Sequence, residues 1–138
     1  MRLWHYKLIP VLPNKMLVSQ WRECIAIMRQ WKKGTLKHRL VSYVMDHNSQ
    51  IFTNYVFKVA NEMDIRKIKY KHQFLTEFTD FASITELELN YLEHNNRYLI
   101  QCYYNLQEKA DRGIISEEEW QKIRKQVNIA ECLMNFNE

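Results

Sequence analysis

Glycine and proline are scarce in this chain, and their scarcity limits the folds open to it. Only two glycines and two prolines occur among the 138 residues, and both prolines precede residue 14. Because the tight turns between strands depend on these residue types, few such turns are available. The sequence therefore predicts an all-α protein built from long helices.

Apolar side chains recur at helical spacing in the first half of the chain. Residues 14–31 and 49–63 each place their apolar positions three and four apart, which puts them on one face of a helix. Gly34 follows the first of these segments, and a glycine commonly ends a helix. A basic loop leads from there to a short segment at residues 40–45, and short helical segments are expected between residues 74 and 81.

Two capping-box patterns predict the helices of the second half. Ser83 with Glu86 marks the start of a helix that runs to about residue 111, and Ser116 with Glu119 marks the start of a last helix. The buried sides of these two helices are expected to contain Leu92, Leu99, Tyr103, Leu106, Ala110, Trp120, Ile123, Val127, Ala130 and Leu133. We therefore predict one compact domain over residues 1–138, with four to five helices.

The composition fits a globular protein away from membranes. Hydrophobic residues make up 46% and charged residues 26% of the chain. No apolar run approaches the roughly 18 residues of a membrane-spanning helix, and Lys7 and Pro10 interrupt any signal-peptide pattern. Cys24, Cys102 and Cys132 lie far apart in apolar helical contexts and are expected to be buried free thiols. These features favour a cytoplasmic protein with no membrane partner.

Charge divides unevenly between the two halves of the chain. Residues 1–72 contain 14 Lys and Arg against 4 Asp and Glu, and residues 73–138 contain 6 against 12. A strongly basic half is typical of proteins that bind a phosphate backbone. Solubility alone can also produce such an asymmetry, so charge by itself leaves both interpretations open.

The usual enzyme motifs are absent from the sequence. Two glycines cannot form a glycine-rich phosphate loop, and no GxSxG, HExxH or CxxC pattern occurs. The five histidines are scattered, and no Cys and His spacing resembles a zinc site. We therefore expect neither a metal nor a cofactor.

Several blocks resemble a known family of repair enzymes. The segments MRLWH, LIPVLP and LVSQWRE are similar to the start of the pyrimidine-dimer DNA glycosylase family, whose best-known member is a phage endonuclease. The segment LKHRLVSYVMDH resembles a second block found in bacterial relatives of that enzyme. The resemblance extends over residues 1–65 and implies a compact all-α fold.

The resemblance also implies a mechanism. Enzymes of this family use the N-terminal α-amine to attack the anomeric carbon of a deoxyribose, forming an imine and releasing the base. An α-amine suits this task because its pKa is about 7.7–8.0, against about 10.4 for lysine. The catalytic glutamate of the family falls on Glu23. Because Arg2 is too bulky for normal removal of the preceding methionine, Met1 would supply the amine, and Arg2 would replace the essential early arginine of the family.

The resulting prediction is a DNA repair glycosylase with abasic-site lyase activity on damaged double-stranded DNA, with the pyrimidine dimer as a candidate lesion. The residues expected to contact DNA are Arg22, His5, Lys33, Lys37, His38, Arg39, Tyr43 and His47. Two other functions remain open: a non-catalytic DNA-binding module of the same fold, and a helical protein–protein adaptor that uses the acidic, tyrosine-rich second half.

Overall fold

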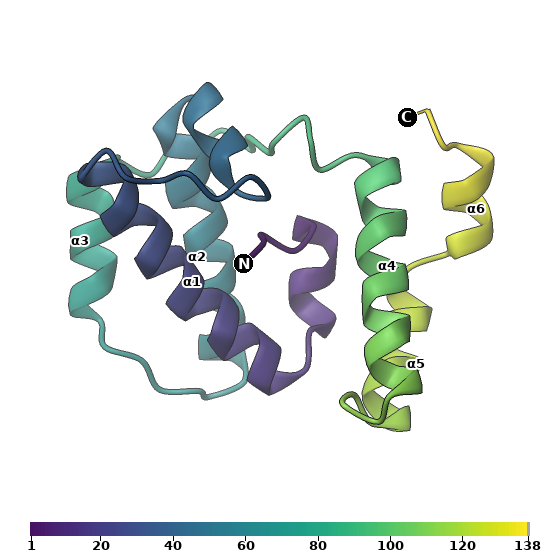
Figure 1. Cartoon of the computed structure of the whole chain (residues 1–138). Helices are drawn as coiled ribbons and strands as arrows, with labels where there is room; N and C mark the ends of the chain where they lie inside the picture. Colours follow the sequence, from purple (N-terminus) through teal and green to yellow (C-terminus); the bar gives the residue numbers. More distant parts are fainter. Residues whose placement is uncertain (138) are drawn as a thin grey trace. The chain divides into compact units, whose positions relative to one another are not determined.

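The structure is a computed structural model that describes residues 1–137, in which all regular secondary structure is helical. In this range the chain forms six α-helices, two 3-10 helices and no strand (Figure 1). The all-α prediction is confirmed, with slightly more helices than the four to five expected. Contacts group the chain into a first unit, Met1–Leu3 with Lys15–Tyr91, and a second unit, Trp4–Asn14 with the residues from Leu92 onward. The expectation of one domain stays a prediction.

The α-helices of the first unit begin and end close to their predicted positions. They are α1 (Asn14–Lys32), α2 (Ser49–Ile65) and α3 (Gln73–Phe81), and the short segment after the basic loop forms the 3-10 helix η2 (Ser42–Asp46). Gly34 ends α1 with a φ of +72°, and its N–H donates to the Trp31 carbonyl at 3.0 Å. A residue with a side chain adopts this left-handed conformation only with strain, which explains the glycine here.

Aromatic rings hold the three α-helices of the first unit together. Phe52 on α2 and Phe78 on α3 are fully buried, with ring centroids 6.1 Å apart. From α1, Trp31 packs edge-on against Phe52 at 5.9 Å, and Trp21 packs against Phe78 at 5.6 Å. Because truncating such a ring to alanine costs about 3–5 kcal/mol, these contacts fix α1 firmly against its neighbours.

The helix predicted from Ser83 is wrong in its first part. Helix α4 spans Asn96–Asp111 and begins at Asn95, whose side chain accepts the Tyr98 N–H at 3.0 Å. The residues before Asn95 form turns and loops, and Leu92, which we expected to be buried, is 82% exposed. Ala110 is half-buried rather than buried.

Polar side chains on α2 explain why this segment is not a helix. Gln50, Asn54 and Lys58 stand four residues apart, so they lie along one side of α2. Gln50 Nε2 donates to the Ser83 hydroxyl at 2.7 Å, Asn54 Oδ1 accepts the Thr85 N–H at 3.2 Å, and Lys58 Nζ donates to the Asn90 side chain at 2.6 Å. Tertiary hydrogen bonds thus replace the capping role expected of Ser83.

The predicted last helix is two helices. Helix α5 (Glu117–Gln126) begins with the expected capping box of Ser116 and Glu119. Val127 then has extended backbone angles, and the Asn128 side chain accepts the Glu131 N–H at 3.1 Å to start α6 (Ile129–Met134). Asparagine favours such a cap over a helix interior. As a result Ala130 and Leu133, both expected to be buried, are exposed.

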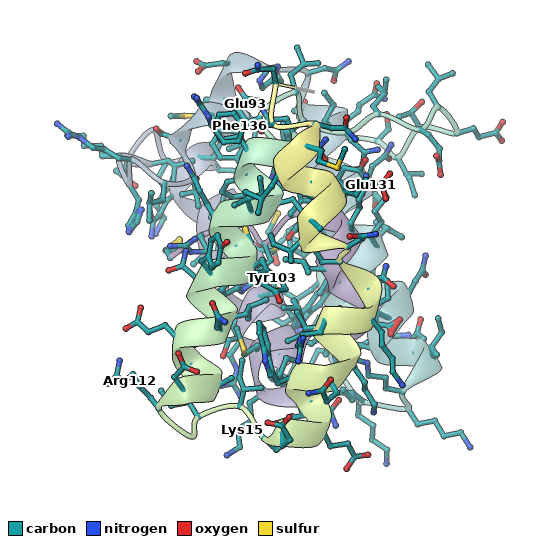
Figure 2. The ribbon with its side chains drawn as sticks, turned by 90° about the vertical axis from the view of Figure 1, so that its right-hand side faces the viewer. Lys15, Glu93, Tyr103, Arg112, Glu131 and Phe136 are labelled. Carbon is teal, nitrogen blue, oxygen red and sulfur yellow. The ribbon has the colours of Figure 1, made fainter. Side chains whose placement is uncertain are left out.

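The second unit consists of the 3-10 helix η1 (Tyr6–Val11) with α4, α5 and α6. Figure 2 shows α4 beside α5 and α6, with Tyr103 between α4 and its neighbours. The Tyr103 ring lies 5.1 Å from that of Trp120 on α5. Helix η1 also contacts α5, and its Leu8 and Ile9 are buried. None of the helices in the part of the chain that the structure describes is long and apolar enough to cross a membrane.

Candidate functional site

The start of the chain is attached to α1. Met1–Leu3 belong to the first unit, and the Leu3 side chain is fully buried there. The Gln20 Nε2 amide donates to the Arg2 carbonyl oxygen at 2.9 Å (Figure 1 marks the N-terminus). Met1 itself is 37% exposed. The terminal amine therefore belongs to an anchored segment that still meets solvent.

The Glu23 carboxylate lies within the electrostatic reach of this terminus. Burial raises the pKa of the Glu23 carboxyl above its usual value. The charged terminal amine, a hydrogen bond from the Arg2 backbone, the charge of His38 and the Arg2 guanidinium act in the opposite direction. Of the predicted catalytic residues, the structure thus brings Met1, Arg2 and Glu23 together, and His38 acts on the same carboxylate.

Sequence reasoning missed Gln20, which joins these groups. Its side chain is fully buried, and Nε2 donates to Glu23 Oε2 at 3.2 Å in addition to the Arg2 carbonyl. The Tyr55 hydroxyl on α2 donates to Gln20 Oε1 at 3.0 Å. One sequence signal was available: Gln20 stands three residues before Glu23, so the two share a face of α1.

The predicted phosphate contacts on the loop after α1 are open to solvent. Lys33, Lys37, His38 and Arg39 are all exposed. We call these four residues the basic loop. Because His38 also influences the Glu23 carboxyl, part of the basic loop borders the candidate catalytic residues. Its side chains are accessible to a polyanion.

Arg22 is exposed and borders a hollow in the first unit. The hollow has a volume of about 430 Å³ and lies between α1 and the segment that leads into α3. Arg29, Lys69 and Lys71 also line it, so four cationic side chains surround one depression. A concave surface with this charge attracts phosphate groups.

Tyr43 and His47 both pack against Tyr91 and lie at the surface only in part. The Tyr43 ring stands edge-on to Tyr91 with centroids 5.3 Å apart, and the His47 ring lies 5.6 Å from the same residue. Both residues are half-buried. Their role toward DNA stays a prediction of the resemblance.

His5 lies in the second unit and is 1% exposed. Its Nδ1 accepts the Lys7 N–H at 3.1 Å, and its ring stacks on those of Tyr6 and His94 at 4.7 and 5.4 Å. Burial lowers the pKa of His5 to about 4, and the nearby charge of Lys7 adds to this effect. In this conformation the side chain offers no surface to a phosphate.

Other nucleophiles and metal ligands are not grouped into a site. All three cysteines are free thiols; Cys24 and Cys102 are buried as predicted, whereas Cys132, also expected to be buried, is half-buried. Burial raises the pKa of Cys24, so its reactive thiolate form is disfavoured. Across residues 1–137, no group of three or more His, Cys, Asp or Glu side chains is arranged to hold a metal ion.

Comparison with known proteins assigns the family. Searches of curated proteins and of solved structures found no match. Residues 1–76, more than half of the chain, match the family model described as pyrimidine dimer DNA glycosylase. The matched range contains Met1, Arg2, Gln20 and Glu23 as well as the basic loop. The chain therefore belongs to the pyrimidine dimer DNA glycosylase family.

Proposed function

We propose that the protein removes damaged bases from double-stranded DNA, with pyrimidine dimers as the substrate class, and cleaves the resulting abasic site. The observation that carries this proposal is the grouping of the terminal amine, the Arg2 backbone N–H and the Glu23 carboxylate. A nucleophile beside an acid–base group is the arrangement that covalent catalysis requires. The free thiols suit a reducing cytoplasm, where we place the activity.

Base release begins with the neutral Met1 amine. Its lone pair forms a bond to C1′ of the damaged nucleotide, the glycosidic C1′–N bond breaks, and the base leaves with that electron pair and takes up a proton. One proton of the amine nitrogen goes to the departing base, and the other passes to O4′ as the C1′–O4′ bond opens and the nitrogen lone pair forms the C1′=N bond, which leaves an imine at C1′ and a hydroxyl at C4′. Glu23 stabilises the positive charge that develops on the sugar and accepts a proton from the amine.

Strand cleavage follows from the imine. A proton leaves C2′, the electron pair moves to form a C2′–C3′ double bond, and the C3′–O bond breaks with loss of the phosphate. Glu23 is the group in the site that can accept the C2′ proton. Neither step needs an oxidant or a reductant.

DNA must be deformed for this chemistry to occur. A sugar carbon inside a stacked duplex is inaccessible, so a nucleotide has to leave the stack before the amine reaches C1′. Arg22, Lys33, Lys37 and Arg39 are exposed cations that can bind the phosphates on either side. These contacts are independent of base sequence, which suits an enzyme that searches for lesions.

Borohydride trapping tests the nucleophile. Borohydride should reduce the imine formed with an abasic duplex to a stable adduct, and peptide mapping should locate it on Met1. Acetylating the terminus or adding one residue before Met1 should abolish the adduct while duplex affinity stays within about twofold, because the binding cations are unchanged. An adduct that maps to a lysine contradicts the proposal.

The variant Glu23→Gln tests the carboxylate. An amide stabilises developing positive charge poorly, so single-turnover base release should fall at least about 100-fold while duplex affinity is retained. Glu118→Gln is the matched control, since Glu118 is an exposed glutamate in the first turn of α5. Base release at the wild-type rate in Glu23→Gln would remove the carboxylate from the mechanism.

A further inference from the structure

The Gln20 side chain makes three hydrogen bonds, which use both of its amide protons and its carbonyl oxygen. Two amide protons go to the Arg2 carbonyl at 2.9 Å and Glu23 Oε2 at 3.2 Å, and Oε1 accepts the Tyr55 hydroxyl at 3.0 Å. Turning the amide over would point its oxygen at two acceptors, so the three partners determine its orientation. The carboxamide is therefore fixed from three sides.

These contacts connect parts of the chain that are distant in sequence. Arg2 precedes Gln20 by 18 residues, and Tyr55 follows it by 35 on a different helix. Gln20 is fully buried and Tyr55 is 4% exposed, so water does not readily substitute for either group. Removing such a donor from buried acceptors costs about 1–3 kcal/mol.

Gln20 and Glu23 together hold the Arg2 backbone on both sides of its Cα, through the first and second peptide units of the chain. The Arg2 backbone hydrogen-bonds to the Glu23 carboxylate, and the Arg2 carbonyl accepts from Gln20. With both groups of Arg2 engaged, rotation about the Met1 backbone is the main freedom left to the terminal amine. The amine therefore moves on a short arc close to Glu23.

We propose that Gln20, oriented by Tyr55, is a positioning residue that sets the terminal amine and Glu23 in reacting geometry. This inference rests on the proposed function for its catalytic consequence. Misplacing a reacting group by about 1 Å can cost about 100-fold in rate. Gln20 is fully buried and so is closed to direct contact with DNA, which places its effect in the chemical step rather than in binding.

The test compares Gln20→Met, Tyr55→Phe and wild type in two ways. In the free protein, hydrogen exchange at the Arg2 amide should be at least about tenfold faster in Gln20→Met, because the carbonyl clamp is lost. On a lesion-containing duplex, single-turnover base release should fall about 10- to 100-fold in Gln20→Met and less in Tyr55→Phe, with the Kd unchanged within about twofold. Matched controls are Gln50→Met on α2 and Tyr103→Phe on α4, which should behave as wild type in both measurements.

A third variant tests whether residue 20 lies beside the acid–base group. Gln20→Glu places a second carboxyl beside Glu23, and like charges disfavour ionisation, so the acid limb of the pH–rate profile should move to higher pH. An unmoved limb in folded Gln20→Glu protein would mean that residue 20 does not contact the group that titrates, which would contradict the inference.

The outcomes test the positioning role of Gln20 separately from the proposed glycosylase activity. Wild-type exchange at Arg2 and wild-type base release in both Gln20→Met and Tyr55→Phe would overturn the inference, as would a loss confined to the Kd. If Gln20→Met does not fold, Tyr55→Phe, which keeps the ring, gives the answer. An inactive wild-type protein would overturn the proposed function, whereas Arg2 exchange would still test the clamp.

Discussion

Glu23 experiences two opposing influences at the scale of a single side chain. Burial raises the pKa of its carboxyl, and the terminal amine, the Arg2 backbone, His38 and the Arg2 guanidinium lower it by less than burial raises it. The folded protein therefore holds the ionised carboxyl at a cost in stability. Titratable groups perturbed in this way concentrate at functional sites, where the required charge is retained despite that cost.

Glu23→Gln should gain stability relative to wild type as the pH rises. Because the pKa is raised in the native state, folded Glu23 keeps its proton to a higher pH than unfolded Glu23, and the free energy of unfolding falls as pH increases through that window. The variant lacks this titration. Urea unfolding at about pH 4 and about pH 7 should give a stability difference, variant minus wild type, that is larger at the higher pH.

A stability difference that shrinks between these two pH values would contradict the raised pKa of Glu23. Glu118→Gln serves again as the control, because it removes an equal charge from an exposed position on α5. Together with the loss of base release, a gain in stability would show that Glu23 is retained for chemistry rather than for folding.

The sequence predicted Glu23 but not the residue that orients it. Glu23 was found through the resemblance of the N-terminal blocks, which carry residue types in a fixed order. Gln20 is a polar side chain on a helix, and its spacing of three residues from Glu23 puts the two on one face without showing that the glutamine is buried. Its role depends on Tyr55, 35 residues away, and on the path of the first three residues. Both of these features depend on tertiary structure and cannot be read from the sequence alone.

Helices could be predicted from the sequence where apolar residues spaced three and four apart form the buried face of the helix. That held for α1, α2 and α3, whose apolar faces meet in one aromatic cluster. It failed for residues 83–95, because Gln50, Asn54 and Lys58 of α2 bind that segment through side chains. A local capping signal cannot reveal competition from another helix.

Helix η1 begins at a histidine that must stay neutral. His5 Nδ1 accepts the Lys7 N–H, and a protonated imidazole has no lone pair for this bond. Burial and the charge of Lys7 lower the pKa of His5, while hydrogen bonds to the His94 and Asn95 backbone act weakly in the other direction. The side chains around the His5 imidazole are those of Tyr6, His94 and Tyr98, and the charge of Lys7 acts on the same ring.

Acid should therefore destabilise the protein through His5. Its pKa falls from 6.5 to about 4 on folding, so the unfolded chain binds more protons between these values. The stabilising contribution is fully present above about pH 6.5 and is lost as the pH falls toward 4; the full loss is on the order of 3 kcal/mol. His5→Gln should flatten the dependence of unfolding free energy on pH in this range, as measured by urea titration. Parallel curves for variant and wild type would contradict it.

At the scale of the whole molecule, charge and family membership fall in the same part of the chain. The family match covers residues 1–76, and residues 1–72 carry 14 Lys and Arg against 4 Asp and Glu. The remaining residues carry 6 against 12. A uniform net charge of +4 would attract DNA weakly, so binding depends on where the cations lie rather than on their total.

Neutralising two cations of the basic loop should weaken duplex binding and reduce its salt dependence by an amount that can be estimated. In Lys37→Gln/Arg39→Gln, two exposed cations are removed from the basic half. Each lost phosphate contact should reduce the slope of log K against log salt by about 1, and affinity should fall alike for all DNA sequences. Filter binding to undamaged duplexes across a salt series measures both quantities.

The matched control for this prediction is Lys122→Gln/Lys125→Gln on α5, which removes the same net charge from the acidic half. If the location of the cations governs binding, this control should keep the wild-type slope of log K against log salt. In the basic-loop variant the magnitude of that slope should decrease by up to about 2. Equal losses in the two variants would mean that net charge alone drives association. An unchanged slope in the basic-loop variant would mean that Lys37 and Arg39 do not meet phosphates, and the DNA-binding face would then have to be sought around Arg22 and the hollow that it borders.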